Sequence, residues 1–470
     1  MNLPAAFIER TRQLLGETKY QQFSEALQQE VPVSIRPNQE KCDFPVKGTP
    51  VPWAAQLGYY LADRPTFTFD PLFHAGAYYV QEASSMFVAR ALQEYVHEAA
   101  VMLDLCAAPG GKSTLARSVL PEGSLLVANE VMRNRSQVLA ENLIKWGHPE
   151  VVVTNNDPAD FTPLHHFFDV ILTDVPCSGE GMFRKDEVAV EEWSLDNVDT
   201  CWRRQRRILN DIWPTLKPGG LLIYSTCTFN VEENEENVAW IAKELGADIL
   251  SVPVETAWGL TGNLEGKDFP AYRFLPGFTK GEGFFMAVLR KHEAPVETIT
   301  LRPEKKKKGK EAKGKGAAPV VAVPKEAKQW VQHPENYQWE VRNQTVVAIP
   351  SHHANEFSIL RQSLKVLHEG ITVGELKGKD LIPQHSLAMS TERIKEAFPQ
   401  APLSYEQAIA YLRKEGLILD GDVPRGYVLV TYQQQPLGFV KNIGNRANNL
   451  YPQEWRIRSG YLPEKPILVW

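Results

Sequence analysis

The 470-residue sequence lacks long apolar runs and regularly spaced cysteines. No stretch of about 18 apolar residues occurs, so no transmembrane helix is predicted. The N-terminal segment carries charges early and has no long apolar region, which argues against a secretory signal. Five cysteines without C-x-x-C spacing indicate neither a disulfide framework nor a zinc site. We therefore expect a cytoplasmic protein with no membrane contact and no metal.

Excess positive charge is also missing. A formal net charge of −6 is not that of a general nucleic-acid binder. The charge is uneven, however, because seven lysines and one glutamate fall between residues 305 and 315. Such a composition cannot bury a core, so we predict a flexible, lysine-rich linker over residues 293–325. A spacer role and a salt-sensitive attraction to phosphate groups both fit this tract.

From Gln81 onward, short apolar runs alternate with stretches of helical periodicity. Near-continuous apolar strands separated by helices are typical of a parallel sheet covered on both faces. We therefore predict a doubly wound α/β core over residues 80–292. The expected strands cover residues 100–105, 124–130, 151–157, 168–176, 220–228 and 283–291.

Smaller units are predicted on both sides of this core. Residues 1–79 begin with apolar residues at helical spacing and are expected to form a small N-terminal domain. Residues 326–395 and 396–470 are expected to form two C-terminal α+β modules. In the second module, Pro436-Leu437-Gly438 is predicted to be the turn between two strands of a small β-barrel.

The stretch LDLCAAPGGKSTLA, residues 103–116, resembles a phosphate-binding loop but lacks its first glycine. Cys106 stands at that position. Here a strand ends, the chain turns through glycines, and a helix N-terminus follows, which exposes backbone N–H groups to a ligand. The loop alone does not separate a nucleotide triphosphate from other ligands.

The next two strands favour an adenosine-containing cofactor. Glu130 ends the second strand, twenty residues after Gly110, where dinucleotide-type folds place a carboxylate on ribose hydroxyls. Asp157 ends the third strand, in reach of an adenine amino group. Because the loop lacks the G-x-G-x-x-G turn, we predict S-adenosylmethionine rather than NAD. The alternative is a core whose strands simply end in polar residues.

Two cysteines follow the fourth and fifth strands. Cys177 lies in DVPC and Cys227 in STCT, so both are expected to face one pocket. A thiolate that adds to carbon-6 of cytosine turns carbon-5 into a nucleophile for methyl transfer. Asp174 is the candidate for stabilising the charge that develops on the ring. A single such cysteine would more often be packing, and we give Cys42, Cys106 and Cys201 that interpretation.

These segments together resemble the RNA cytosine-5 methyltransferase family, the Sun and nucleolar-protein group. The matching stretches are AYYVQEASSM (77–86), LDLCAAPGGKST, ANEVMRNR (128–135), DVPCSGEGMFRKD (174–186), LKPGG and YSTCTFNVEENE (224–235). The resemblance implies a Rossmann-like methyltransferase core, an RNA-binding N-terminal domain, and a last module similar to a PUA domain. It is strongest to bacterial methyltransferases of 16S rRNA, and a monomer acting on 16S rRNA or the small subunit is expected.

The resemblance also implies residue roles that the spacing leaves open. Cys227 would be the nucleophile, Cys177 would assist product release, and Asp174 would act as a base or cofactor contact. The implied cofactor contacts are Cys106, Ala107, Ala108, Pro109, Gly110, Gly111, Lys112, Glu130, Arg135, Asp157 and Asp174.

RNA contacts are predicted from positive charge near the motifs. The candidates are Arg184 and Lys185 after the first cysteine motif, and Lys441 and Arg446 in the last module. The cluster Arg203, Arg204, Arg206 and Arg207 fits a solvated helix face as well as an RNA surface. His165-His166 and His352-His353 lack ligand spacing and are predicted to be surface residues.

The alternatives to a 16S rRNA methyltransferase are a tRNA cytosine-5 methyltransferase and a noncatalytic ribosome-assembly factor that binds RNA.

Overall fold

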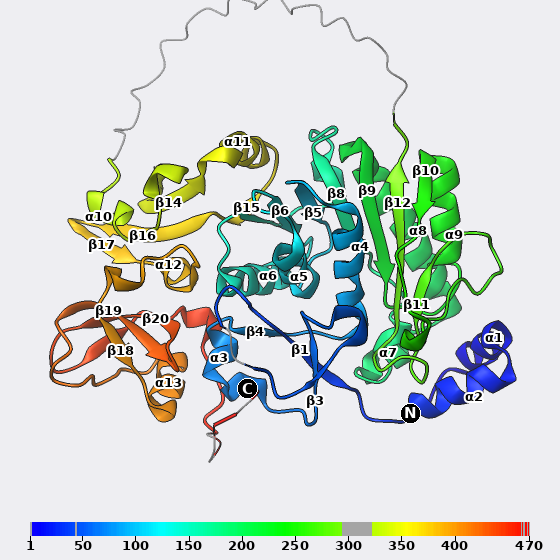
Figure 1. Cartoon of the computed structure of the whole chain (residues 1–470), viewed down its shortest axis with the longest axis horizontal. Helices are drawn as coiled ribbons and strands as arrows, with labels where there is room; N and C mark the ends of the chain where they lie inside the picture. Colours follow the sequence, from blue (N-terminus) through cyan, green and yellow to red (C-terminus); the bar gives the residue numbers. More distant parts are fainter. Residues whose placement is uncertain are drawn as a thin grey trace, which may run out of the picture.

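A large mixed sheet forms the centre of the protein (Figure 1). The computed structural model describes residues 2–42, 45–293 and 322–461, together with 463, 466, 467 and 469. Most of the predicted lysine-rich linker lies outside the described residues. The strand order of the sheet is β10-β12-β9-β8-β5-β6-β7-β15, and β11 pairs with β12.

Strands β5 to β9 pair with one another in parallel and have the expected doubly wound order. After β5 the chain adds β6 and β7 on one side and then crosses to add β8 and β9 on the other. Ligands bind at such a switch point, outside the carboxyl ends of the strands. The five strands are β5 (Val101–Asp104), β6 (Leu125–Asn129), β7 (Val151–Thr154), β8 (Phe168–Asp174) and β9 (Leu216–Thr226).

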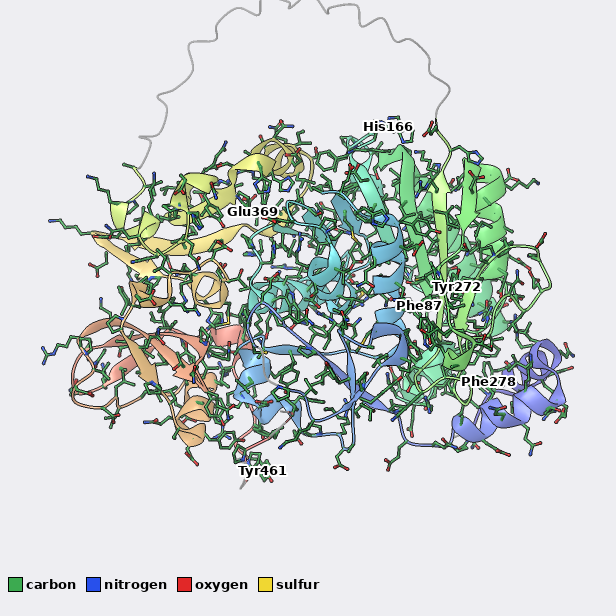
Figure 2. The ribbon with its side chains drawn as sticks, in the orientation of Figure 1. Phe87, His166, Tyr272, Phe278, Glu369 and Tyr461 are labelled. Atoms are coloured by element: carbon green, nitrogen blue, oxygen red, sulfur yellow. The ribbon has the colours of Figure 1, made fainter. Side chains whose placement is uncertain are left out.

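Alternating side chains divide these strands between two hydrophobic cores. Met102 of β5 belongs to the core beneath helices α4, α5 and α6, whereas Leu103 faces α8, α9 and α11. In the first core, Phe87 and Tyr272 pack with ring centroids 5.2 Å apart (Figure 2). Both faces of the sheet are therefore covered, as predicted. The helices are α4 (Val88–Tyr95), α5 (Gly111–Val119), α6 (Arg133–Trp146), α8 (Leu195–Ile212), α9 (Glu235–Trp240) and α11 (Ala354–Ser363).

The sheet's edges differ from the all-parallel prediction. At one edge β12 (Phe284–Lys291) runs antiparallel to β9, and β10 (Ala247–Leu250) is antiparallel to β12, as is β11 (Tyr272–Phe274). At the other edge β15 (Val366–Glu369) pairs antiparallel with β7. Since β15 comes from the C-terminal third of the chain, no local pattern in the sequence indicated it.

The N-terminal residues form a helical hairpin and a small sheet. The helices are α1 (Ala5–Leu15) and α2 (Glu17–Ala26), which pack with Phe183 and Phe229 near the cysteine loops. Phe278 also contacts this cluster (Figure 2). The sheet order is β2-β3-β1-β4, and its strands are β1 (Val33–Pro37), β2 (Thr49–Pro50), β3 (Tyr59–Leu61) and β4 (Tyr78–Val80).

Arg36 of β1 joins this small sheet to the core. The side chain is fully buried and donates hydrogen bonds to Gln81 Oε1 at 3.0 Å and Thr114 Oγ1 at 2.5 Å. Its guanidinium also lies 4.4 Å from the Trp146 ring centroid. Because Thr114 lies in the first turns of α5, this contact holds β4 against the helix that follows the glycine loop.

Two four-stranded sheets occupy the C-terminal third, at the left of Figure 1. The first contains β13 (Tyr337–Arg342), β14 (Thr345–Pro350), β16 (Ile371–Lys377) and β17 (Asp380–Pro383). The second contains β18 (Gln400–Pro402), β19 (Gly426–Tyr432), β20 (Gln435–Asn442) and β21 (Ala447–Asn449). Shorter helices lie beside them: α10 (Lys325–Lys328), α12 (His385–Met389) and α13 (Tyr405–Leu412).

The predicted turn at Pro436-Leu437-Gly438 is wrong, because these residues lie inside β20. The hairpin instead turns at Gln433 and Gln434, whose φ angles are 47° and 66°. Two residues with positive φ match the twist of a two-residue hairpin, even though glycine or asparagine is usual there. Within the described residues, no helix is both long and apolar enough to span a bilayer.

Candidate active site

Cys177 and Cys227 meet at the carboxyl edge of the central sheet. Cys177 follows β8 and Cys227 follows β9, and the two sulfur atoms lie 3.3 Å apart. Both are free thiols. Parallel pairing of β8 with β9 explains this approach, because it brings the ends of the two strands to the same level. Two thiols that were 50 residues apart in the sequence thus form one site.

Two buried glutamates hold the cysteine loops together. Glu180 accepts hydrogen bonds from Thr228 Oγ1 at 2.7 Å, from the Phe229 amide at 2.7 Å and from the Asn230 amide at 3.0 Å. Glu233 in turn accepts from the Ser178 amide at 3.1 Å. Each carboxylate therefore lies on one loop and is bound by the other. The sequence interpretation missed both residues, although each lies inside a cysteine motif.

Gly181 explains why the first cysteine motif continues as S-G-E-G. Its amide donates to the Cys227 carbonyl oxygen at 2.7 Å. A Cβ atom at this position would overlap that same oxygen. Only glycine allows the two loops to approach this closely, so the residue helps to set the separation of the sulfur atoms.

Asp174, the last residue of β8, is held in place by two donors. Lys112 Nζ lies 2.7 Å from its Oδ2 atom, and Ser225 Oγ donates to Oδ1 at 2.9 Å. Burial alone would lower the pKa of Lys112, but the Asp174 carboxylate and its hydrogen bond raise it overall. Lys112 is therefore a permanent cation in the cavity that Cys227 also lines.

The glycine loop connects β5 to α5 and is fixed by its neighbours. The Ala107 amide donates to the Asn129 carbonyl at 2.8 Å, and Arg135 Nη2 donates to the Ala108 carbonyl at 2.7 Å. Gly110 has a φ of 112°, a left-handed conformation that suits glycine. Gly111 then begins α5. The loop residues predicted to bind cofactor, 106–112, thus run along the edge of the site. Burial raises the pKa of Cys106, so this thiol stays neutral.

Glu130 and Asp157 lie beyond the ends of β6 and β7, as their strand positions predicted. Glu130 is buried, accepts from the Met132 amide at 2.9 Å, and lies 3.3 Å from Arg135. Asp157 caps the turn Pro158–Phe161 and lies 3.7 Å from Arg207. Both line one cavity of about 540 Å³, which also contains residues of the glycine loop, Asp174 and both cysteines.

A second cavity of about 300 Å³ adjoins the first. It shares Cys106, Ala108, Asp174, Met182 and Cys227 with the first cavity. Cys177 lines the first cavity, whereas Cys227 lines both. The sequence interpretation missed the contribution of β4, since Tyr79 and Val80 lie far from the cysteine motifs. The lining residues that the sequence interpretation missed include Tyr79, Val80, Gln81, Glu82 and Phe284, whereas Lys112 and Lys185, which also line this cavity, were among the predicted site residues.

The predicted RNA-contact residues differ in their availability. The Arg184 guanidinium is buried, where it pairs with Glu282 at 3.1 Å and donates to the Gly281 carbonyl at 2.7 Å. Lys185, by contrast, is exposed and lines the second cavity. In the last module, Arg446 is exposed and Lys441 lies 3.4 Å from Asp380.

The arginine cluster on α8 divides in a similar way. Arg206 packs between Trp202 and Trp240, with its guanidinium carbon 4.1 Å and 5.0 Å from the ring centroids. Arg204 and Arg207 line the first cavity instead.

Among the histidine pairs, His165 and His166 are exposed as predicted. The surface prediction is wrong for His353, which is buried.

Asp104→Asn is expected to change how stability depends on pH. Burial raises the pKa of Asp104 from 3.8 to about 7, and the hydrogen bond from Ser113 only partly offsets this effect. Protonated Asp104 therefore stabilises the fold below about pH 4, and this contribution is lost as the pH rises through about 7. Relative to the wild type, the variant should gain on the order of 2–4 kcal/mol between pH 4 and pH 8. Urea unfolding at both pH values measures the difference, and parallel pH profiles would contradict it.

Models of known protein families match three segments of the chain. A family model described as "16S rRNA methyltransferase RsmB/F" matches residues 91–290. Residues 3–83 match a model described as the N-terminal domain of 16S rRNA methyltransferase RsmF. Residues 398–457 match the model of the methyltransferase RsmF PUA domain.

Individual relatives extend over nearly the whole chain. The ribosomal RNA small subunit methyltransferase F of Serratia proteamaculans is 30% identical, with 98% of each protein aligned. The protein of that name from Salmonella agona is 32% identical over 98% of this chain and 97% of its own length. Among solved structures, a methyltransferase homolog from Pyrococcus horikoshii is 29% identical, with a TM-score of 0.53 over 61% of this chain and 94% of that one.

Proposed function

Because the chain belongs to the 16S rRNA methyltransferase RsmB/F family, we propose that it methylates carbon-5 of a cytosine in small-subunit rRNA. The family is one of S-adenosylmethionine-dependent methyltransferases. The observation that carries the proposal is a pair of thiols 3.3 Å apart where two cavities join. One cavity suits the cofactor, and the other suits a flat base.

The lining of the first cavity fits an adenosine-containing cofactor. Glu130 and Asp157 both line this cavity, where Glu130 would bind the ribose hydroxyls and Asp157 the adenine amino group. Val131 and Met132 line the same cavity and are 52% and 56% exposed although both are apolar. A bound adenine ring would cover them. When bound here, S-adenosylmethionine supplies an electrophilic methyl group on its sulfonium.

Two observations support Cys227 rather than Cys177 as the nucleophile. Cys227 lines both cavities and so can reach a base in the second while facing the cofactor in the first. The hydrogen bond with Cys227, together with burial, raises the pKa of the Cys177 thiol. Cys177 therefore keeps its proton at neutral pH and can donate it toward the Cys227 sulfur.

The proposed reaction proceeds through a covalent adduct of protein and RNA. The Cys227 thiolate forms a bond to carbon-6, and the electrons of the carbon-5–carbon-6 double bond make carbon-5 nucleophilic. Carbon-5 then forms a bond to the methyl group as the methyl–sulfonium bond breaks. A base removes the carbon-5 proton, the double bond re-forms, and the Cys227–carbon-6 bond breaks. Cys177, as the neighbouring acid, assists this release by protonating or hydrogen-bonding the departing sulfur.

Asp174 is proposed to act where both cavities meet. Its carboxylate is fixed by Lys112 and Ser225, so it keeps one orientation toward the ring that the second cavity would hold. A group of this kind offsets the charge that develops on the pyrimidine during addition. From the same position, Asp174 could instead contact the cofactor or remove the carbon-5 proton.

Several features favour rRNA over the alternatives. Two thiols in contact beside a cofactor cavity favour an enzyme over a noncatalytic assembly factor, which needs neither. The N-terminal and PUA-domain matches favour 16S rRNA over tRNA. Exposed Lys185 at the mouth of the second cavity supplies positive charge along the approach of the RNA strand.

Transfer of a labelled methyl group tests the proposal. Purified protein with labelled S-adenosylmethionine should modify 16S rRNA, either free or in small subunits, and bisulfite sequencing should then show 5-methylcytosine. Matched tRNA from the same cells should stay unlabelled. Labelling of tRNA alone would favour the tRNA enzyme, and absence of labelling from free 16S rRNA, small subunits and tRNA would favour the noncatalytic factor.

A further inference from the structure

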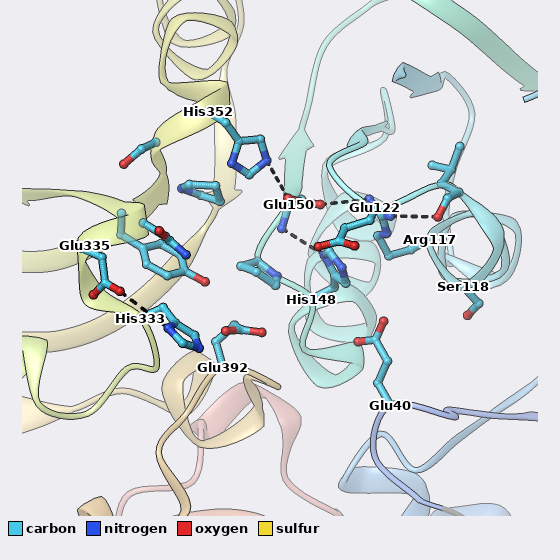
Figure 3. Close-up of a pocket in the computed structure, with 16 residues that line it drawn as sticks. Glu40, Arg117, Ser118, Glu122, His148, Glu150, His333, Glu335, His352 and Glu392 are labelled. Carbon is cyan, nitrogen blue, oxygen red and sulfur yellow. Dashed lines mark hydrogen bonds and ion pairs between the residues drawn. The ribbon is translucent and has the colours of Figure 1, made fainter. Parts of the chain in front are cut away.

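An acidic cleft lies between the central core and the C-terminal third, and it shares no lining residue with the two cavities beside the thiols (Figure 3). The cleft has a volume of about 800 Å³ and is lined by five glutamates, three histidines and one arginine. Its walls come from α5, from the segment before β7, and from residues 333–352 and 392. Such a lining attracts cations.

Three ligand-type side chains lie together at this cleft: Glu150 and His352 line it, and the buried His353 lies beside His352. Glu150 precedes β7, while His352 and His353 form the turn before α11. One ligand atom from each lies within 4.8 Å of the others. His352 Nε2 is 2.7 Å from Glu150 Oε1, and the two imidazole rings have centroids 4.3 Å apart. The cluster joins residues some 200 positions apart, which is why spacing in the sequence did not indicate it.

Neighbouring groups hold His353 and Glu150 in orientations that leave a ligand atom of each free for a metal ion. His353 Nε2 lies 2.8 Å from the Gly123 carbonyl oxygen. Because a carbonyl only accepts, Nε2 carries the proton and Nδ1 keeps its lone pair. On the carboxylate side, Arg117 Nη1 lies 3.6 Å from Glu150 Oε2 and leaves Oε1 facing His352.

Glu356 provides an additional carboxylate beside the cluster. Its Oε2 atom lies 3.9 Å from His353 Nδ1. This oxygen is buried and receives no hydrogen bond from the residues that the structure describes. A buried carboxylate oxygen without a donor is costly unless a cation balances it.

We propose that Glu150, His352 and His353 bind one divalent transition-metal ion of the zinc type, and that the carboxylate of Glu356 beside His353 helps to balance its charge. Two imidazoles and carboxylate oxygens are a donor set that zinc accepts in tetrahedral geometry, whereas calcium and magnesium prefer oxygen alone. The ion would connect the start of β7 in the core to the turn before α11. Its role would be to fix the C-terminal third against the methyltransferase core.

Zinc titration of the full chain tests this site. The vicinal thiols can also bind zinc, so every protein in the test carries Cys177→Ser and Cys227→Ser. After chelator treatment and dialysis, calorimetry with Zn²⁺ should show one site per chain. His352→Ala should weaken this binding at least 100-fold, and Glu356→Gln about tenfold. His165→Ala is the matched control, because His165 belongs to an exposed histidine pair and should leave the affinity unchanged.

Thermal unfolding provides a second readout that does not depend on activity. Saturating Zn²⁺ should raise the Tm of the parent protein and of His165→Ala, but not that of His352→Ala. Because His352 is half exposed, its replacement should leave the chain folded, and Glu356→Gln gives an independent check. Equal zinc affinity in the parent and in His352→Ala would overturn the proposal. Absence of zinc binding would also overturn it and leave an ion pair between His352 and Glu150.

Discussion

Cys227→Ala is expected to abolish methyl transfer. Without a sulfur that adds to carbon-6, carbon-5 of cytosine has no route to becoming nucleophilic. We expect kcat/KM to fall by at least about 10³-fold, which corresponds to a loss of about 4 kcal/mol of transition-state stabilisation. Incorporation of labelled methyl groups into 16S rRNA measures this loss directly, and the variant should form no covalent complex with RNA.

Cys201→Ala is the matched control for this experiment. Cys201 is buried in α8, and it lines neither cavity. Its replacement should change the rate by no more than about twofold, since a buried cysteine acts as a small apolar side chain. Cys227→Ala protein must also unfold at the temperature of the wild type. Full activity of a folded Cys227→Ala variant would remove the covalent mechanism.

Cys177→Ala, unlike Cys227→Ala, is expected to accumulate a covalent complex with RNA that is visible on a denaturing gel. The Cys227 sulfur would still add to the base and the methyl group would still be transferred. Release would be slow, because the thiol 3.3 Å away that assists the departing sulfur is gone. We expect a stable protein–RNA adduct, visible as a retarded band under denaturing conditions, and turnover reduced by about 10²-fold or more.

The double variant Cys177→Ala, Cys227→Ala separates the two roles. It should form no adduct, because adduct formation requires Cys227 alone. If the retarded band persisted in the double variant, the covalent bond would come from another residue. If Cys227→Ala formed the band and Cys177→Ala did not, the two roles would have to be exchanged.

The strand-end residues could be placed from the sequence because one rule covers them all. In a parallel sheet the carboxyl ends of the strands share an edge, so Glu130, Asp157 and the two cysteines had to lie near one another once their strands were recognised. The strands β5 to β9 contain nearly continuous apolar runs that are mostly buried, which made them easy to recognise. The observed strand order confirms the predicted doubly wound core.

Other parts of the site depend on contacts that no local pattern contains. Tyr79 lines the second cavity because Arg36 holds the N-terminal sheet against α5, and nothing near Tyr79 in the sequence signals that contact. From the sequence alone, Glu180 and Glu233 would be expected on the surface, as most glutamates are. In the structure the carboxylate of each accepts hydrogen bonds from the other cysteine loop. The opposite holds for Arg184, which the sequence suggested as an RNA contact. Its guanidinium forms an ion pair with the buried carboxylate of Glu282.

The pairing of β15 with β7 has a consequence for how the protein is made. A chain that ended at the last core strand, Lys291, would leave the backbone groups of Val151–Thr154 open to solvent. An unprotected edge strand of three consecutive valines is prone to pair with the same strand of another molecule. During synthesis this edge stays bare until residue 369 has emerged. We therefore expect truncated catalytic cores to aggregate, and the nascent chain to need protection at this point.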